Sequence, residues 1–167
     1  LLGFNQTLAE RFEKVRFAER LQHGKGSFID AAAVTYGGVN RVQEGAVRQM
    51  DLGEDHTLAN GEGWYWVLQG SPESSTGECV QAVRKTHGGD QALWDAFAAV
   101  TTALEEALRE DADPRELIRE NHRLLKKIGV VPDTTARFVE AVKDTGGAAK
   151  ISGAGTLSGT IVKIKRK

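Results

Sequence analysis

The sequence is poor in cysteine, in long apolar runs and in excess charge, and each shortage excludes a class of protein. A single cysteine, Cys79, cannot form an internal disulfide framework and suits a reducing compartment. The 22 basic and 23 acidic side chains leave a formal net charge of −1, which gives no overall field to attract nucleic acid or an anionic membrane. No apolar run could span a bilayer, and residues 1–6 lack the basic start of a signal peptide. We therefore expect a cytoplasmic protein that binds neither nucleic acid nor membrane.

The chain does contain enough apolar material for a folded core. Of its 167 residues 40% are hydrophobic, which suits one ordinary domain or slightly more than one. It opens on LLGF without a methionine, so we expect it to be part of something longer.

The first third of the chain predicts a helix followed by short strands. Residues 7–22 have apolar side chains at close to helical period and end near Gly24. VNRV and AVRQMDL predict two strands around a turn at Glu44-Gly45, and WYWVLQG (64–70) predicts a buried strand. The polar stretch 53–63 is the expected linker.

The remainder predicts helices and then two strands. The expected helices are 76–87 capped by Thr76, 90–109 capped by Asp90, one from Pro114 to before Gly129, and 134–145. AAKIS and TIVKIK predict two strands joined by the loop GAGTLSG. This order favours an α+β fold in which helices back one face of an antiparallel sheet.

Two carboxylates stand out near the N-terminal end. HGKGSFIDAAAVTYGG (23–38) places Asp30 ahead of an apolar run, where an ionised group is costly unless a cation or a hydrogen-bond donor meets it. Asp30 is either the N-cap of a short helix or a general base. Glu19 is either a solvated side chain of an amphipathic helix or a magnesium ligand. His23, one turn later, suits a cation at a helix C-terminus.

The loop GAGTLSG (153–159) allows two interpretations. Its glycines let backbone N–H groups approach an anion closely, but a loop between two strands needs glycines anyway. No Lys-Ser or Lys-Thr follows, so the loop is not a P-loop.

Four motifs resemble one family in content and in order. ERxxHGxxSxxD (19–30), followed by TYGG (35–38), resembles the middle signature of mevalonate kinases, ERxxHGxPSGxDNxxSTxGG. GSPESSTGE (70–78) is similar to the family's TGxxxxT loop, NHRLL with IGV (121–130) resembles NHxLLxxLGV, and KISGAG (150–155) resembles KLTGAGGGG. The chain is thereby identified as a member of the superfamily of galactokinase, homoserine, mevalonate and phosphomevalonate (GHMP) kinases.

The resemblance implies a fold and an activity. Residues 59–167 would form the C-terminal domain of a GHMP kinase, a ferredoxin-like antiparallel sheet with helices on one face, and residues 1–58 would be a remnant of the N-terminal domain. The activity would be phosphoryl transfer from ATP to the hydroxyl of mevalonate, with Mg²⁺. Related kinases of phosphomevalonate or a sugar, and a non-catalytic domain that has lost nucleotide binding, remain alternatives.

The resemblance also assigns roles to residues. Asp30 would take the hydroxyl proton, and Glu19 would bind magnesium. The other assigned residues would line the cleft: His23, Ser27 and Thr76 near the acceptor, and Gly153, Ala154 and Gly155 at the nucleotide.

Part of the family pattern is missing or altered. The lysine-bearing N-terminal strand and the PxxGLGSSA phosphate loop do not appear, so we expect the N-terminal half to come from the same chain or a separate subunit, and the fragment to be inactive alone. A homodimer is compatible with these expectations. Gly26, Phe28, Ala31 and residues 156–158 depart from the motifs, and Phe28 is expected to add bulk beside the acceptor.

Overall fold

A computed structural model describes residues 6–23, 28–58, 63–68, 75–153 and 159–163. The chain divides into two compact units, Leu1–Gly53 and Glu54–Lys167, and each is described by itself. The division falls within the stretch 53–63 that the sequence marks as a linker. No helix in the described ranges is long and apolar enough to cross a membrane.

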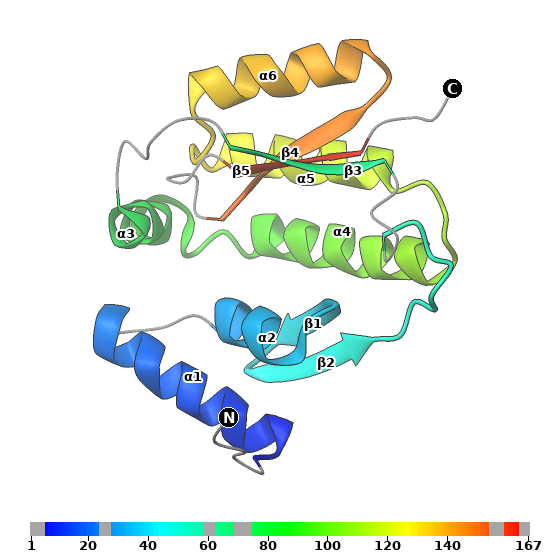
Figure 1. Cartoon of the computed structure of the whole chain (residues 1–167). Coiled ribbons are helices and arrows are strands. Elements are labelled where there is room, and N and C mark those ends of the chain that lie inside the picture. The colour runs from blue at the N-terminus through cyan, green and yellow to red at the C-terminus, as the bar shows by residue number, and fades with distance from the viewer. Residues whose placement is uncertain (1–5, 24–27, 59–62, 69–74, 154–158, 164–167) are drawn as a thin grey trace. The chain divides into compact units, whose positions relative to one another are not determined.

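The described part of unit 1 consists of two helices and a two-stranded ribbon (Figure 1). Its elements are α1 (Leu8–His23), α2 (Phe28–Tyr36), β1 (Val39–Gln43) and β2 (Ala46–Met50). Thr7 and Glu10 form a capping box at the start of α1: the Thr7 hydroxyl accepts from the Glu10 N–H at 3.2 Å, and the Glu10 carboxylate accepts from the Thr7 N–H at 2.8 Å. Glu44 and Gly45 both have positive φ, as a two-residue hairpin turn requires, so the predicted turn is confirmed.

The core of unit 1 is small and aromatic. Phe12 of α1 is buried against Ala31 and Ala32 of α2. The Phe12 ring lies 5.5 Å from the Tyr36 ring and 6.4 Å from the Phe28 ring, measured between centroids. These rings join α1 to α2, which in turn packs against β1.

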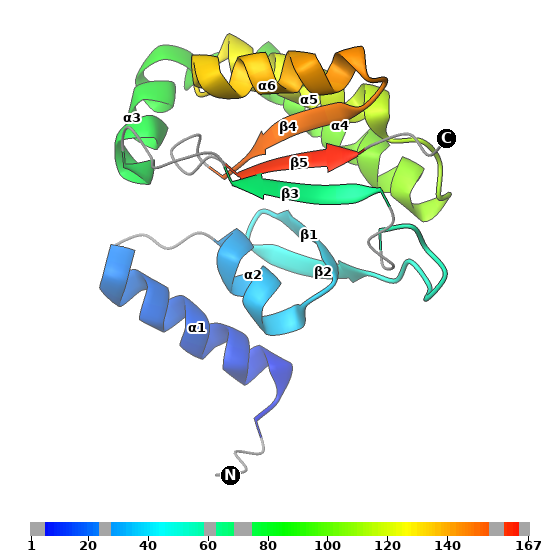
Figure 2. The ribbon, with the colours of Figure 1, turned by 45° about the horizontal axis from the view of Figure 1, so that its top comes forward.

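Unit 2 contains a three-stranded antiparallel sheet and four helices in its described part. They are β3 (Trp64–Leu68), α3 (Thr76–His87), α4 (Gln91–Arg109), α5 (Arg115–Lys127), α6 (Asp133–Asp144), β4 (Ala148–Ser152) and β5 (Gly159–Lys163). The strand order is β3-β5-β4, and Figure 2 shows the three strands side by side. Because α5 and α6 both pack against β4, and α4 packs against α5, the predicted α+β class with helices behind an antiparallel sheet is confirmed.

Two local predictions for unit 2 are wrong. Ser75 caps α3 in place of Thr76, because the Ser75 hydroxyl accepts from the Glu78 N–H while the Glu78 carboxylate accepts from the Ser75 N–H. The strand β3 is not buried throughout. It pairs only with β5 among the described strands, and Trp66 and Leu68 are exposed while Val67 packs toward the core.

Buried His56 ties the segment before β3 to the end of α4. Its Nε2 lies 2.6 Å from the Leu108 carbonyl oxygen, and its Nδ1 accepts a hydrogen bond from the Leu58 N–H at 3.0 Å. Since Nδ1 accepts, Nε2 carries the hydrogen and donates to the carbonyl. Asp111 Oδ1 lies 3.3 Å from the same Nε2.

We predict that His56→Ala lowers the free energy of unfolding of unit 2 by about 1–3 kcal/mol, because it leaves a buried carbonyl and an N–H without partners. Chemical denaturation followed by circular dichroism measures the change. Asp55→Ala, a substitution of the exposed neighbouring residue, is the control and should leave the midpoint almost unchanged. Equal midpoints for the two variants would show that His56 does not anchor the segment.

Candidate functional site

Asp30 lies inside α2 rather than at its N-cap, so the capping interpretation is wrong. It is the third residue of the helix, and its side chain is exposed. A carboxylate in the first turn is favoured by the helix dipole. Ile29 and Val34, which flank it on the outer side of α2, are exposed as well. Asp30 is therefore an accessible carboxylate in apolar surroundings.

Glu19 differs from the solvated side chain that helix periodicity alone suggests. It follows Phe12 and Val15 on the side of α1 that packs against α2, and it is half-buried. Its Oε2 atom is fully buried and has no hydrogen-bond partner among the described residues. A buried carboxylate oxygen without a partner is costly, and a bound cation would relieve the cost.

Helices α1 and α2 follow one another along the chain and contact each other. Glu19 lies in the last two turns of α1, and Asp30 lies in the first turn of α2. No cluster of three or more His, Cys, Asp or Glu side chains that could hold a metal ion occurs in the described part of the chain. The described residues therefore do not by themselves form a three-ligand site around Glu19.

Four further assigned residues lie wholly or partly outside the described residues. His23 ends α1, but its side chain is not described, and Ser27, Ala154 and Gly155 are outside the described ranges. Their predicted roles stay predictions.

The Phe28 side chain, expected beside the acceptor, packs in the core of unit 1. The Arg16 guanidinium lies over its ring, 4.0 Å from the centroid. A Cβ built at Gly45 would lie 3.3 Å from the same ring, so the hairpin turn closes over it. Phe28 is thus part of the packing between α1, α2 and the ribbon.

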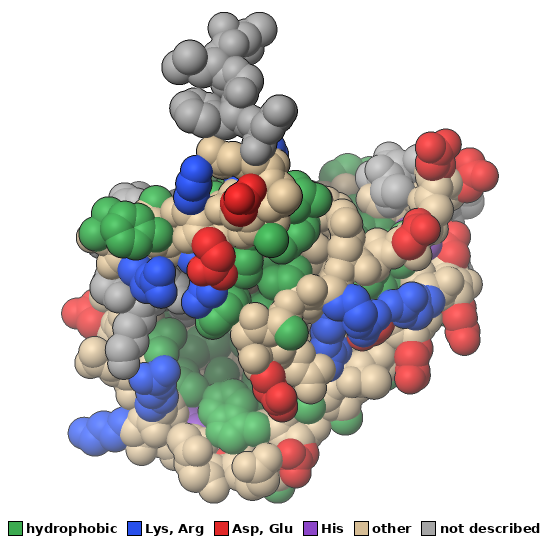
Figure 3. Space-filling model, turned by 90° about the horizontal axis from the view of Figure 1, so that it is seen from below, with side chains coloured by type: hydrophobic (Ala, Val, Ile, Leu, Met, Phe, Trp, Pro, Cys, Tyr) green, Lys and Arg blue, Asp and Glu red, His purple; other side chains and the backbone are tan. Residues whose placement is uncertain are grey.

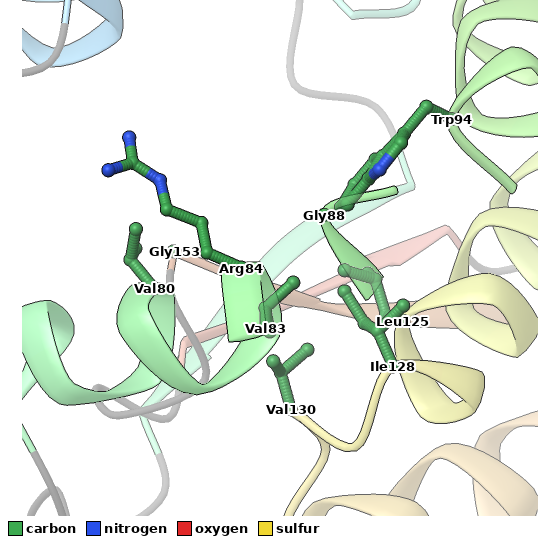
Figure 4. A pocket seen from close by; sticks show the side chains of 9 residues that line it. All are labelled: Val80, Val83, Arg84, Gly88, Trp94, Leu125, Ile128, Val130 and Gly153. Atoms are coloured by element: carbon green, nitrogen blue, oxygen red, sulfur yellow. The ribbon is translucent and has the colours of Figure 1, made fainter. Parts of the chain in front are cut away.

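Unit 2 contains an apolar pocket of about 460 Å³ between α3, α4 and the end of α5 (Figure 4). The residues that line it are Val80, Val83, Arg84, Gly88, Trp94, Leu125, Ile128, Val130 and Gly153. Thr76 precedes Val80 by one helical turn on the same side of α3. The α3 face that begins at the assigned residue Thr76 therefore runs along a pocket that the assigned residue Gly153 also borders.

The pocket offers apolar surface and one cation. Figure 4 shows the Arg84 guanidinium directed away from the cluster of Val83, Leu125 and Ile128. The Trp94 indole N–H already donates to the His87 carbonyl oxygen at 2.9 Å. The pocket can therefore hold the apolar part of a ligand whose charged part lies near Arg84.

No motif or pattern in the sequence predicts this pocket. The signal available was the spacing of Thr76, Val80, Val83 and Arg84, which places them on one side of the expected helix 76–87. The spacing does not show which residues face this side of the helix; in the structure they come from α4, from the end of α5 and from the end of β4.

His122 of α5 is buried and Lys150 of β4 is half-buried, and they belong to two of the four motifs. Burial is the main cause that lowers the pKa of His122, and the charge of Lys126 contributes. The His122 Nδ1 has no hydrogen-bond partner among the described residues. Burial also lowers the pKa of Lys150, whose Nζ donates to the Ile151 carbonyl oxygen at 2.8 Å. The two residues lie on elements that pack together, α5 and β4.

Comparison with solved structures identifies the fold. The chain superposes on the Methanococcus jannaschii mevalonate kinase with a TM-score of 0.77 and 24% identity, covering 96% of this chain and 50% of that one. It superposes on the L. major mevalonate kinase, solved in complex with R-mevalonate, with a TM-score of 0.78 and 24% identity, covering 98% and 51%. The mevalonate kinase of Staphylococcus aureus MRSA252 gives a TM-score of 0.59 at 20% identity, covering 99% and 52%.

These likenesses show a mevalonate kinase-like fold, that of the C-terminal half. The chain spans about half the length of the solved structures that it matches. No protein-family model matches the sequence, and no curated protein matches it.

We predict that His122 makes the stability of unit 2 pH-dependent. Because its pKa is lowered in the fold, the unfolded chain takes up the proton first as the pH falls. Its contribution to stability is complete above the ordinary histidine pKa of about 6.5 and is lost as the pH falls from there towards the folded-state pKa. Glu140, which opposes the lowering, and the cations Lys126 and Lys150 act on the same ring.

Urea denaturation at pH 8 and at pH 5 measures this loss, which we expect to be smaller in His122→Leu than in the natural chain. Val139→Ala is the control, because it removes volume from the same part of the core without removing a titrating group. An equal loss in His122→Leu and the natural chain would contradict the prediction.

Proposed function

We propose that this chain is the C-terminal half of a kinase that transfers a phosphoryl group from ATP to the hydroxyl of mevalonate. The observation that carries the proposal is the buried Glu19 Oε2, which has no hydrogen-bond partner in the part of the chain that the structure describes, on the helix before the one that bears the exposed Asp30. The four motifs and the mevalonate kinase-like fold support the same activity. The matched L. major enzyme was solved with R-mevalonate bound, which makes mevalonate the first acceptor to test.

Asp30 acts as the general base in this proposal. Its carboxylate takes the proton of the acceptor hydroxyl while the hydroxyl oxygen bonds to the γ-phosphorus of ATP. The bond between that phosphorus and the oxygen that bridges it to ADP breaks, and ADP leaves with the electron pair. Asp30 suits this role because its side chain is accessible and lies in the first turn of a helix held by a packed core.

Glu19 is the residue that would hold Mg²⁺. The ion, when bound, neutralises charge on the phosphate oxygens. Mg²⁺ commonly takes one or two protein carboxylates and completes its shell with water and phosphate, so a single glutamate from this chain suits it. A bound cation would give the buried Oε2 atom the partner that the described residues do not provide.

Unit 2 contributes binding surface. Gly153 has a φ of +84°, a conformation that favours glycine, at the start of the loop assigned to the nucleotide. Thr76 at the start of α3 is the assigned contact to the acceptor. Turnover in this proposal also requires the other half of the kinase fold, either on the same polypeptide or on a second one.

We expect Asp30→Asn to reduce kcat by about 10²–10⁴-fold, the range that a positioned general base contributes. The measurement uses labelled ATP and the complete two-half protein, with mevalonate, phosphomevalonate and a sugar as acceptors. Asp51→Asn, an exposed aspartate of the same unit, is the control. Unchanged turnover in Asp30→Asn would reject the base assignment, and transfer only to another acceptor would favour a related kinase.

We expect Glu19→Gln to raise the Mg²⁺ concentration required for half-maximal activity by about tenfold or more. It should also reduce the rise in melting temperature that Mg²⁺ with ADP gives the natural protein. Glu13→Gln is the control, since Glu13 pairs with Arg16 on an exposed part of α1. Equal Mg²⁺ dependence in both variants would exclude Glu19 as a ligand.

A further inference from the structure

Helices α5 and α6 both pack against β4, and a cavity of about 610 Å³ lies between the two helices. A volume of this size is within the range of small-molecule sites. Ala149 of β4, which is fully buried, lines the cavity at the sheet, and buried Val139 of α6 adds a second apolar side chain. We call this space the α5–α6 cavity. None of the residues that line it has an assigned role in phosphoryl transfer.

His122 of α5 is a buried polar side chain that borders the α5–α6 cavity. It is only 7% exposed, and its Nδ1 atom has no hydrogen-bond partner among the described residues. The Nε atom of Arg119, one turn earlier on the same side of the helix, is also buried without a partner in this part of the chain. Buried polar atoms in native structures normally have a partner, so two such atoms at one cavity favour an occupant that has a polar group.

The charged groups that act on the His122 ring are positive on balance. Lys126 and Lys150 both lower its pKa, in addition to the larger effect of burial, and Glu140 opposes them. The ring is therefore uncharged at neutral pH, and an uncharged imidazole still has one N–H to donate. A negatively charged ligand would relieve the excess of positive charge around it.

The carboxylates that line the cavity are already paired, whereas one of its cations is not. The pairs are Glu116 with Arg119, Glu120 with Arg123, and Glu140 with Lys143. Lys126 is the remaining lining cation, and it has no ion-pair partner among the described residues. It is exposed and follows His122 by four residues on the same side of α5, so one ligand can reach both side chains.

We propose that the α5–α6 cavity binds a small monocarboxylate, with its carboxylate beside Lys126 and His122 and its apolar body against Val139 and Ala149. The unpaired cation suits one negative charge, whereas the three lining glutamates would repel a doubly charged phosphate more strongly. Figure 3 shows basic and acidic side chains mixed over one surface of the described part of the molecule, so surface charge by itself selects no ligand there. The cavity differs because it joins an unpaired cation to buried apolar side chains.

The test titrates the full chain with 4-phenylbutyrate, a monocarboxylate with an apolar body, and follows the His122 ring by NMR. We expect saturable binding and a higher pKa of His122 in the bound protein, because a nearby carboxylate favours the imidazolium form. 4-Phenylbutanamide has nearly the same shape without the charge, and acetate has the charge without the apolar body. Each should bind more weakly than 4-phenylbutyrate by about fivefold or more.

Lys126→Met should weaken the binding of 4-phenylbutyrate by about fivefold, because it removes the charge and keeps most of the apolar stem. Lys127→Met is the matched control, since Lys127 is the next residue of α5, is exposed and is not one of the described residues that line the cavity. Arg84→Met is a second control, because Arg84 is the cation of the pocket between α3 and α4. Neither control should change the affinity. Circular dichroism of all three variants should match that of the natural chain, since the substituted side chains are exposed.

The absence of saturable binding, equal binding of the amide, or binding that Lys126→Met leaves unchanged would overturn the proposal. A loss of affinity in Arg84→Met alone would place the ligand in the pocket between α3 and α4, and would overturn it as well. So would an unchanged pKa of His122 in the bound protein, because a carboxylate beside the ring has to raise it. The measurement is of binding and does not require phosphoryl transfer, so its result is independent of the proposed function.

Discussion

The packing of α5 against both α4 and β4 is the constraint on which the rest of unit 2 depends. Ile118 and Leu124 are each only 2% exposed, and burying such a side chain contributes about 1.5–3 kcal/mol. The exposed ion pairs along α5, such as Glu120 with Arg123, contribute about 0–1 kcal/mol each. Apolar burial therefore decides where α5 lies. Once it is in place, Arg115 and Arg119 donate to the Gly146 and Gly147 carbonyls and hold the turn before β4.

Two of the four motifs lie on α5 and β4, beside the pocket of unit 2, but their polar residues do not line that pocket. His122 is buried and Lys150 is half-buried, and burial disfavours the charged form of each. Their neighbours along the chain face the pocket: Leu125 and Gly153 both line it. The polar motif residues thus belong to the support of β4 and α5, and the adjacent apolar residue and glycine form the wall that a ligand would meet.

Local signals in the sequence predicted most of the elements, and the errors arose where a tertiary partner decides. Helical period and capping residues located α4 within a residue of its ends, since Asp90 accepts from the Leu93 N–H. The exposure of Trp66 could not be predicted in this way, because apolar content does not tell whether both faces of a sheet are covered. Asp30 looked like a cap because its surroundings resemble a helix start, and only the fold places it in the first turn, at the third residue of α2. The pocket brings Val80 of α3 together with Gly153 after β4, two residues that are far apart in the sequence.

The two carboxylates of unit 1 differ in their surroundings. Glu19 Oε2 is buried and has no hydrogen-bond partner among the described residues, so a bound cation would lower the cost of its burial. Asp30 is exposed in the first turn of α2 and is open to water and to a substrate. Binding of a substrate beside Ile29 and Val34 would exclude water from this carboxylate and strengthen its interactions with charged partners, because such interactions are stronger in surroundings of lower dielectric.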